Sequence, residues 1–160
     1  MGYGFPAAIG AKIAMPEKTV IDIAGDASIQ MNIQELSTCT QYNVPVKIIN
    51  MNNGYLGMVK QWQDMQYEGR YSHSTYEDSL PDFVKLAEAF GAKGIKVSDP
   101  ALLDDAIAEM IAYDGPVVLD CMVEKHENCL PMIPSGNAHN EMLLPTDEVR
   151  AITGAGANLV

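Results

Sequence analysis

The sequence is poor in charge, and above all in positive charge. Asp, Glu, Lys and Arg make up only 19% of its 160 residues, and 21 acidic residues against 10 basic ones give a formal net charge of −11. Nucleic-acid binding depends on Lys and Arg side chains that neutralise phosphates, so this balance argues against a nucleic-acid partner. An anionic ligand would have to be met by backbone N–H groups or by a metal ion.

Cysteines and long apolar runs are also scarce. The three cysteines, Cys39, Cys121 and Cys129, form no CxxC pair, and an odd number at these spacings is typical of reduced thiols in a cytoplasmic protein. No apolar run reaches about 18 residues, which argues against a membrane span. The chain has the length of a single domain, and 48% of its residues are hydrophobic. We therefore expect it to bury a hydrophobic core of its own.

Short β-branched runs alternate with stretches of helical periodicity. Strands are predicted at 19–25, 44–52, 94–98 and 116–123. A small-residue helix is predicted within 2–14, and further helices at 29–43, 55–65, 81–90 and 101–113. This order predicts an α/β fold, with an open parallel sheet and helices on both faces.

The predicted α/β domain occupies residues 1–124. We expect it to be incomplete at its N-terminus, because a domain seldom begins with a buried helix and no preceding strand. Residues 125–160 are predicted to be a C-terminal tail, since Pro131, Pro134, Gly136 and Pro145 interrupt any regular element there.

Polar side chains follow the first two predicted strands. Asp26 lies in Gly25-Asp26-Ala27-Ser28, and Asn53, 27 positions later, lies in Asn52-Asn53-Gly54. Ligands bind at the carboxyl ends of the strands in such sheets, and carboxylate and amide oxygens suit Mg²⁺ that also takes phosphate oxygens. Gly25 and Ala27 keep the loop narrow, so its backbone N–H groups can meet an anion. Alternatively, Asp26 is only a helix cap and Asn53-Gly54 only a turn.

These motifs resemble those of a known enzyme family. GDAS followed by NN is similar to the GDG…NN signature of thiamine-diphosphate enzymes, with Ala27 in place of its second glycine. MGYGFPAAIGAK, GMVKQWQ and LPDFVKLAEAFGAKGIKV resemble the C-terminal cofactor domain of the acetohydroxyacid synthase (acetolactate synthase) catalytic subunit, a likeness that runs from Met1 to about residue 145.

The resemblance implies a transferase that joins two 2-ketoacids, pyruvate with pyruvate or 2-ketobutyrate, in branched-chain amino-acid biosynthesis. It implies thiamine diphosphate, Mg²⁺ and FAD as cofactors, a homodimer or homotetramer, a possible regulatory subunit and a cytoplasmic location. Family members exceed 500 residues, and the glutamate that activates the cofactor and the FAD-binding domain lie outside the part that this sequence matches. The resemblance therefore implies an inactive fragment without a catalytic residue of its own.

The resemblance also implies roles for particular residues. Mg²⁺ would be held by Asp26, Asn53 and the main-chain oxygen of Tyr55. Substrate would contact Met58, Val59 and Trp62, although Met58 and Trp62 at helical spacing also suit a core pair. The implied cofactor-binding residues are Met1 beside the aminopyrimidine, Gly25, Asp26, Ala27, Ser28, Asn53, Tyr55, Leu56, Gly57 and Met58.

Two other functions remain open at this point. The chain could be the cofactor domain of another thiamine-diphosphate-dependent 2-ketoacid decarboxylase or oxidase. It could also be a phosphate-binding α/β module that performs no chemistry. GMVKQWQ and PMIPSG favour the synthase.

Overall fold

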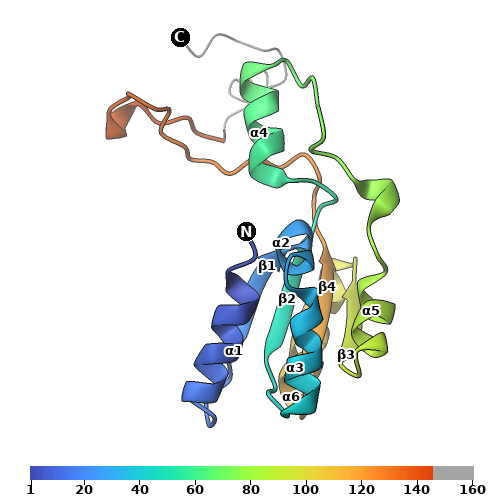
Figure 1. The fold of residues 1–160 in the computed structure, drawn as a ribbon. Helices are drawn as coiled ribbons and strands as arrows, with labels where there is room; N and C mark the ends of the chain where they lie inside the picture. The colour runs from blue at the N-terminus through green and yellow to red at the C-terminus, as the bar shows by residue number, and fades with distance from the viewer. Residues whose placement is uncertain (146–160) are drawn as a thin grey trace. The chain divides into compact units, whose positions relative to one another are not determined.

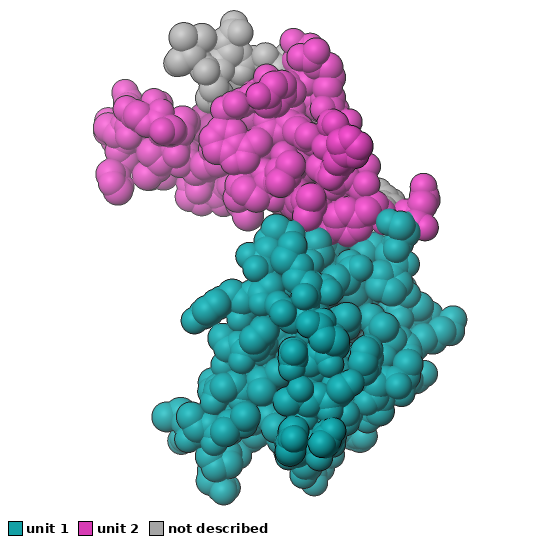
Figure 2. Space-filling model, viewed as in Figure 1, with its two compact units in different colours: residues 1–53, 79–124 teal, residues 54–78, 125–160 magenta. Residues whose placement is uncertain are grey.

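The computed structural model describes residues 1–145, so the last part of the predicted tail, residues 146–160, lies outside the described residues. The chain forms two compact units, shown in different colours in Figure 2. Unit 1 comprises residues 1–53 and 79–124, and unit 2 comprises residues 54–78 together with the chain from residue 125. The predicted boundary at residue 124 coincides with a unit boundary, whereas residues 54–78 group with the C-terminal segment. The predicted division into domains remains a prediction.

Unit 1 is built on a four-stranded parallel sheet (Figure 1). The strands lie in the order β1-β2-β4-β3, so β2 and β4 occupy the centre. Both central strands are largely buried, as expected for strands covered on both faces. Their bounds are β1 Ile21–Gly25, β2 Lys47–Asn52, β3 Lys93–Val97 and β4 Val117–Met122.

Helices pack on both faces of this sheet, and the predicted fold class is confirmed. On one face, a large apolar core joins side chains of helices α1, α2, α3 and α5 to Ile48 and Val118 of the central strands. On the other face, α6 packs on a smaller core that includes Val117 and Leu119. The helices are α1 Gly4–Ala14, α2 Asp26–Gln30, α3 Leu36–Gln41, α5 Phe83–Ala89 and α6 Leu103–Ala112.

Local chemistry explains how α5 begins and how closely it packs. The Asp82 carboxylate accepts hydrogen bonds from the N–H groups of Val84 and Lys85, both at 3.1 Å, and so caps the helix. A side chain at Gly94 of β3 would bring its Cβ to 2.6 Å from the Val84 Cα. Gly94 therefore lets α5 lie directly against the sheet.

The helix predicted at 29–43 is interrupted. A short 3₁₀ segment, η1 Ile33–Glu35, separates α2 from α3. The interruption follows Asn32, which leaves the helical conformation at φ −136° and whose side-chain amide donates to the Gly2 carbonyl. This tertiary hydrogen bond joins residues 30 positions apart, so periodicity alone could not reveal it.

Unit 2 contains one longer helix, α4 Gly57–Gln66, and little other regular structure within its described part. Two isolated antiparallel bridges, Tyr55 with Thr75 and Met132 with Leu143, connect its segments. The remaining short 3₁₀ helices of the described chain are η2 Glu77–Ser79, η3 Pro100–Leu102 and η4 His139–Glu141. In residues 1–145, no helix has both the length and the apolar character needed to cross a membrane.

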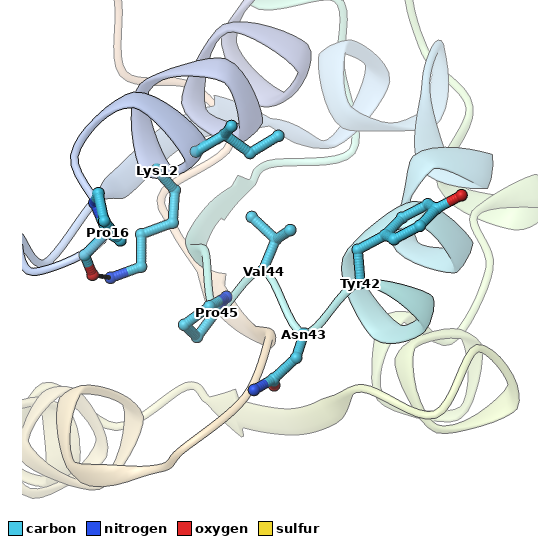
Figure 3. Close-up of a pocket in the computed structure, with 7 residues that line it drawn as sticks. Lys12, Pro16, Tyr42, Asn43, Val44 and Pro45 are labelled. Carbon is cyan, nitrogen blue, oxygen red and sulfur yellow. Dashed lines mark hydrogen bonds between the residues drawn. The ribbon is translucent and has the colours of Figure 1, made fainter.

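A hollow of about 300 Å³ opens in unit 1 beside the C-terminal ends of α1 and α3 (Figure 3). Lys12 extends along it, and its ammonium donates to the carbonyls of Pro16 and Lys18, both at 2.7 Å. The hollow lies next to Pro45, ahead of the first residue of β2, and thus at the edge of the sheet opposite to the strand ends that carry Asp26 and Asn53.

Candidate cofactor-binding site

The parallel pairing of β1 and β2 brings Asp26 and Asn53 to one edge of the sheet. Gly25, the last residue of β1, pairs with Met51 of β2, so Asp26 and Asn53 both follow directly on the carboxyl ends of adjacent strands. Asp26 is buried, with 1% of its surface exposed, and its Oδ1 accepts from the Ala27 N–H at 2.6 Å. A carboxylate buried at this edge suits a metal ligand.

The first residues of the chain are attached to the same edge. The Gly2 N–H donates to the Ser28 hydroxyl at 3.0 Å, and the Asn32 amide donates to the Gly2 carbonyl. These bonds tie the residue after Met1 to the segment that follows β1, while the Met1 side chain itself is exposed. The predicted place of Met1 beside a cofactor remains a prediction.

A second layer of polar side chains lies just below these strand ends. The side-chain amides of Asn50 and Asn52 donate to Asp120 Oδ1 at 2.8 and 3.0 Å. The amide oxygens of both asparagines are buried and find no donor among the described residues. This layer therefore contains buried oxygen acceptors and no positively charged side chain.

The edge fits a diphosphate held through a metal ion. Asp26 and Asn53 carry the hard oxygen atoms that Mg²⁺ prefers. A Cβ built on Gly25 would meet no atom within 4 Å, so the backbone there is open to a ligand. Helix α2 has only five residues, and its dipole contributes less than the predicted helix N-terminus would. A diphosphate at this edge would therefore depend on a metal ion more than on a helix dipole.

The remaining predicted site residues belong to unit 2. Tyr55 and Leu56 lead into α4, and Gly57 and Met58 are its first residues. The Tyr55 carbonyl is the predicted third metal ligand, and its place in the ligand set remains a prediction. Among described residues, no group of three or more His, Cys, Asp or Glu side chains could hold a metal, which is compatible with a predicted set that contains one carboxylate.

The three predicted substrate-pocket residues share the exposed side of α4. Met58, Val59 and Trp62 are 51%, 42% and 39% exposed. The opposite side of the helix is buried through Lys60, Gln61, Asp64 and Met65. Trp62 is therefore no core residue, and its ring is accessible to a ligand.

Sequence reasoning missed a buried polar cluster on α4. The Lys60 ammonium lies 2.5 Å from Asp64 Oδ2 and within 6 Å of the ring centres of Tyr55 and Tyr71. The Tyr71 hydroxyl donates to Asp64 Oδ1, and burial together with this bond raises the pKa of Tyr71 to about 12. The i,i+4 spacing of Lys60 and Asp64 was visible in the sequence, but nothing there indicated that the pair is buried or that Tyr71 completes it.

Two glutamines of α4 were missed as well. Gln61 is buried and forms two hydrogen bonds with the main chain of Cys129. Its side-chain amide accepts from the Cys129 N–H at 2.7 Å and donates to the Cys129 carbonyl at 3.2 Å. Gln63 donates to the Ser72 carbonyl at 3.0 Å and accepts from the Ser74 hydroxyl. These side chains attach two separate segments of unit 2 to one helix.

Burial sets the pKa of the two cysteine thiols in unit 1, Cys39 and Cys121. It raises the pKa of Cys39 to about 11 and also raises the pKa of Cys121, so neither thiol is activated. All three cysteines are free, as the sequence predicts.

Comparison with known proteins agrees with this geometry. Residues 1–121 match the family described as "Thiamine pyrophosphate enzyme, C-terminal TPP binding domain". The chain belongs to that family. The resemblance predicted from GDAS, NN and GMVKQWQ is thereby confirmed at the level of the cofactor domain.

Curated members of the family include close relatives of this chain. The acetolactate synthase large subunit of Haemophilus influenzae is 54% identical over 145 residues, covering 90% of this chain and 25% of that protein. The acetolactate synthase isozyme 3 large subunit of Escherichia coli is 52% identical over 151 residues, covering 92% and 26%. The chain thus spans about a quarter of the length of these curated relatives.

A solved structure shows the same fold. The thiamine diphosphate-dependent 4-hydroxybenzoylformate decarboxylase of Rhodococcus jostii RHA1 matches with a TM-score of 0.70 and 32% sequence identity. The match covers 78% of this chain and 23% of that protein. Acetolactate synthase large subunits and a 4-hydroxybenzoylformate decarboxylase therefore both contain a part similar to this chain.

Proposed function

We propose that this chain is the thiamine-diphosphate- and Mg²⁺-binding part of an acetolactate synthase. The observation that carries the proposal is the meeting of Asp26 and Asn53 at one sheet edge, in a chain 52% identical to an acetolactate synthase large subunit over 151 residues. The reaction would condense pyruvate with a second pyruvate or with 2-ketobutyrate, in branched-chain amino-acid biosynthesis.

Each residue at the site has a physical task in this proposal. When bound, thiamine diphosphate supplies the electron sink that decarboxylation of a 2-ketoacid requires. Asp26 and Asn53 would hold Mg²⁺, with the Tyr55 carbonyl as a third ligand, and so screen the diphosphate from a chain of net charge −11. The backbone of Ala27, Ser28 and Leu56–Met58 would contact the phosphates.

In this proposal, the exposed side of α4 and the first residue of the chain would contribute the remaining contacts. Met58, Val59 and Trp62 would form an apolar wall against the substrate, which would exclude water from it. Met1 would lie beside the aminopyrimidine. Gly25 would leave room for the cofactor, because a side chain there would enter the open space above β1.

Further parts of the proposal concern the whole enzyme. The glutamate that activates the cofactor and the FAD-binding domain would lie in the three quarters of the relatives that this chain does not match. The enzyme would be a cytoplasmic homodimer or homotetramer, with a regulatory subunit in some assemblies. The 160 residues alone would make no acetolactate, because cofactor activation needs that carboxylate.

A grafted enzyme tests this function. In it, the present chain replaces the matching quarter of the Escherichia coli isozyme 3 large subunit. We expect the grafted enzyme to form acetolactate from pyruvate only with thiamine diphosphate and Mg²⁺. Asp26→Ala should abolish the Mg²⁺-dependent binding of thiamine diphosphate in calorimetry, and Asn53→Ala should weaken it less, because it removes a neutral ligand.

The result can also contradict the proposal. Wild-type cofactor affinity in the Asp26→Ala graft would remove Asp26 from the metal ligands and leave it as an acidic residue of the first turn of α2. The competing function, a phosphate-binding module, predicts that the chain itself is stabilised by FMN, NAD or ATP in a thermal-shift titration. Stabilisation by one of these, with none by thiamine diphosphate and Mg²⁺, would favour that module.

A further inference from the structure

Residues 70–76 run back along the start of α4. The Ser74 carbonyl accepts from the Leu56 N–H at 2.9 Å, and the Gly54 carbonyl accepts from the Tyr76 N–H at 3.2 Å. Tyr55 and Thr75 face each other between these two bonds as an antiparallel bridge. Residues 54–56, which precede α4, are therefore tied to residues 74–76 by two main-chain hydrogen bonds.

Side chains anchor residues 70–76 to α4 at three points, one of which is the bond from the Gln63 amide to the Ser72 carbonyl. The Ser74 side chain is fully buried, and its hydroxyl donates to Gln63 Oε1. The Tyr71 hydroxyl donates to Asp64 Oδ1, and the other oxygen of this carboxylate lies 2.5 Å from the Lys60 ammonium. A surface loop that only connected α4 to α5 would need neither a buried serine nor a satisfied carboxylate.

The two sets of bonds form a closed path. From α4 it runs through Gln63 to Ser74, through the Ser74 main chain to Leu56, and through Leu56 back into α4. A carbonyl in such a bridged segment keeps one direction, whereas a carbonyl in a free loop samples several. Pre-organisation of this kind strengthens binding of a ligand that needs that direction.

We propose that residues 70–76 are a brace that fixes the direction of the Tyr55 carbonyl for the metal ion. Ser74, Gln63 and Tyr71 are then positioning residues, which act through the main chain of residues 54–56 and touch neither metal nor substrate. This inference rests on the proposed function, which makes the Tyr55 carbonyl a metal ligand. It adds that the metal affinity depends on side chains that lie 8, 16 and 19 positions after Tyr55 in the chain.

The first test measures, without any ligand, whether residues 70–76 protect the main chain of residues 54–56. Hydrogen–deuterium exchange of the 160-residue chain reports on the Leu56 amide, which donates to Ser74, and on the Val123 amide, which donates to Asn52 in unit 1. In Ser74→Ala we expect exchange at Leu56 to rise about tenfold and exchange at Val123 to stay unchanged. Ser72→Ala is the matched control, because the Ser72 side chain is exposed on the same segment.

The second test measures the affinity for the metal ion. In the grafted enzyme with thiamine diphosphate, Ser74→Ala and Tyr71→Phe should each raise the Mg²⁺ concentration for half-maximal activation by roughly three- to tenfold, the equivalent of about one hydrogen bond. Turnover at saturating Mg²⁺ should be retained, and Mn²⁺ binding followed by electron paramagnetic resonance should weaken in parallel. Tyr67→Phe is the control for Tyr71→Phe, since the Tyr67 hydroxyl makes no hydrogen bond among the described residues, whereas the Tyr71 hydroxyl donates to Asp64.

Three outcomes separate the inference from the proposed function. Unchanged exchange at Leu56 in Ser74→Ala overturns the brace, whatever the graft does. Faster exchange with unchanged Mg²⁺ affinity overturns its role toward the metal and leaves the proposed function intact. A wild-type graft that binds no thiamine diphosphate counts against the proposed function, and the exchange experiment still decides whether residues 70–76 hold residues 54–56.

Discussion

Units 1 and 2 are stabilised by different chemistry. The interior of unit 1 is mainly apolar, formed by helices on a parallel sheet around side chains such as Leu36, Ile48 and Phe83. Around α4, unit 2 instead buries Lys60, Gln61, Asp64 and Ser74, each of them hydrogen-bonded or ion-paired. Apolar burial is non-directional, whereas a polar interior is stable only when every partner is in place. Unit 2 therefore tolerates less change in side-chain chemistry, and unit 1 less change in volume.

The largest effect is expected from a cavity in unit 1. Phe83 is 1% exposed at the start of α5, and Phe83→Ala should lower the free energy of unfolding by about 3–5 kcal/mol. Leu102→Ala is the control, since Leu102 is 57% exposed and should change stability by less than about 0.5 kcal/mol. Urea unfolding followed by circular dichroism measures both. If Phe83→Ala and Leu102→Ala lowered the free energy of unfolding equally, the apolar core would not be the main source of stability in unit 1.

The next effect should come from the charge pair of unit 2. Lys60→Met leaves the Asp64 carboxylate without its cation, and the expected cost is about 2 kcal/mol, below that of a fully dry pair because the Asp64 side chain is 12% exposed. The double variant Lys60→Met/Asp64→Leu removes both charges and should recover part of this loss. Limited proteolysis within residues 54–78 measures the opening of unit 2. A double variant as unstable as the sum of the singles would contradict a polar interior held by pairing.

Asp22 is one of three carboxyl groups that unit 1 buries, together with Asp26 and Asp120. It has 6% of its surface exposed, and burial raises its pKa above the usual 3.8. The folded protein then binds this proton more tightly than the unfolded chain does, so stability decreases as the pH rises through the folded pKa. Asp22→Asn should raise stability at pH 7 by on the order of 1 kcal/mol and change it little at pH 3.

A pH series of urea unfolding for both proteins tests this expectation. Asp82→Asn is the control, because its hydrogen bonds to α5 lower the pKa of this exposed carboxyl, so the sign of its pH dependence is opposite. Asp82 stabilises the fold at neutral pH and loses that contribution as the pH falls. A benefit of Asp22→Asn that grows toward acidic pH would contradict a raised pKa for Asp22.

The smallest effect on stability is expected at Trp62. Its ring is 39% exposed on α4, so Trp62→Leu should cost less than about 0.5 kcal/mol. In the grafted enzyme the same change should shift the choice between 2-ketobutyrate and pyruvate by roughly tenfold, since a methylene in a shaped pocket is worth about 1–3 kcal/mol. Product ratios from mixed substrates measure this choice. If Trp62→Leu lowered the stability of the protein and left the product ratio unchanged, Trp62 would have a structural role only.

The same contrast explains what could be predicted from the sequence. The strands and helices of unit 1 follow hydrophobic periodicity, which depends only on neighbours in the chain. Asp26 and Asn53 could be found because each directly follows a strand, and adjacent parallel strands end at the same edge. Helix α4 was also predictable, whereas the bonds from Gln63 to Ser74 and from Asp64 to Tyr71 were not. A polar side chain carries no pattern that distinguishes a buried partner from a solvated one.

The strand order has a consequence for how the chain folds. Strands β1 and β2 pair residues 26 positions apart, Ile21 with Lys47, and β3 and β4 pair residues 24 positions apart, Lys93 with Val117. The central pair, Lys47 with Val117, joins residues 70 positions apart. Closing that longer loop costs more entropy, and non-local pairing slows folding. We expect two strand–helix–strand halves to form early and independently, and their joining along β2 and β4 to set the folding rate.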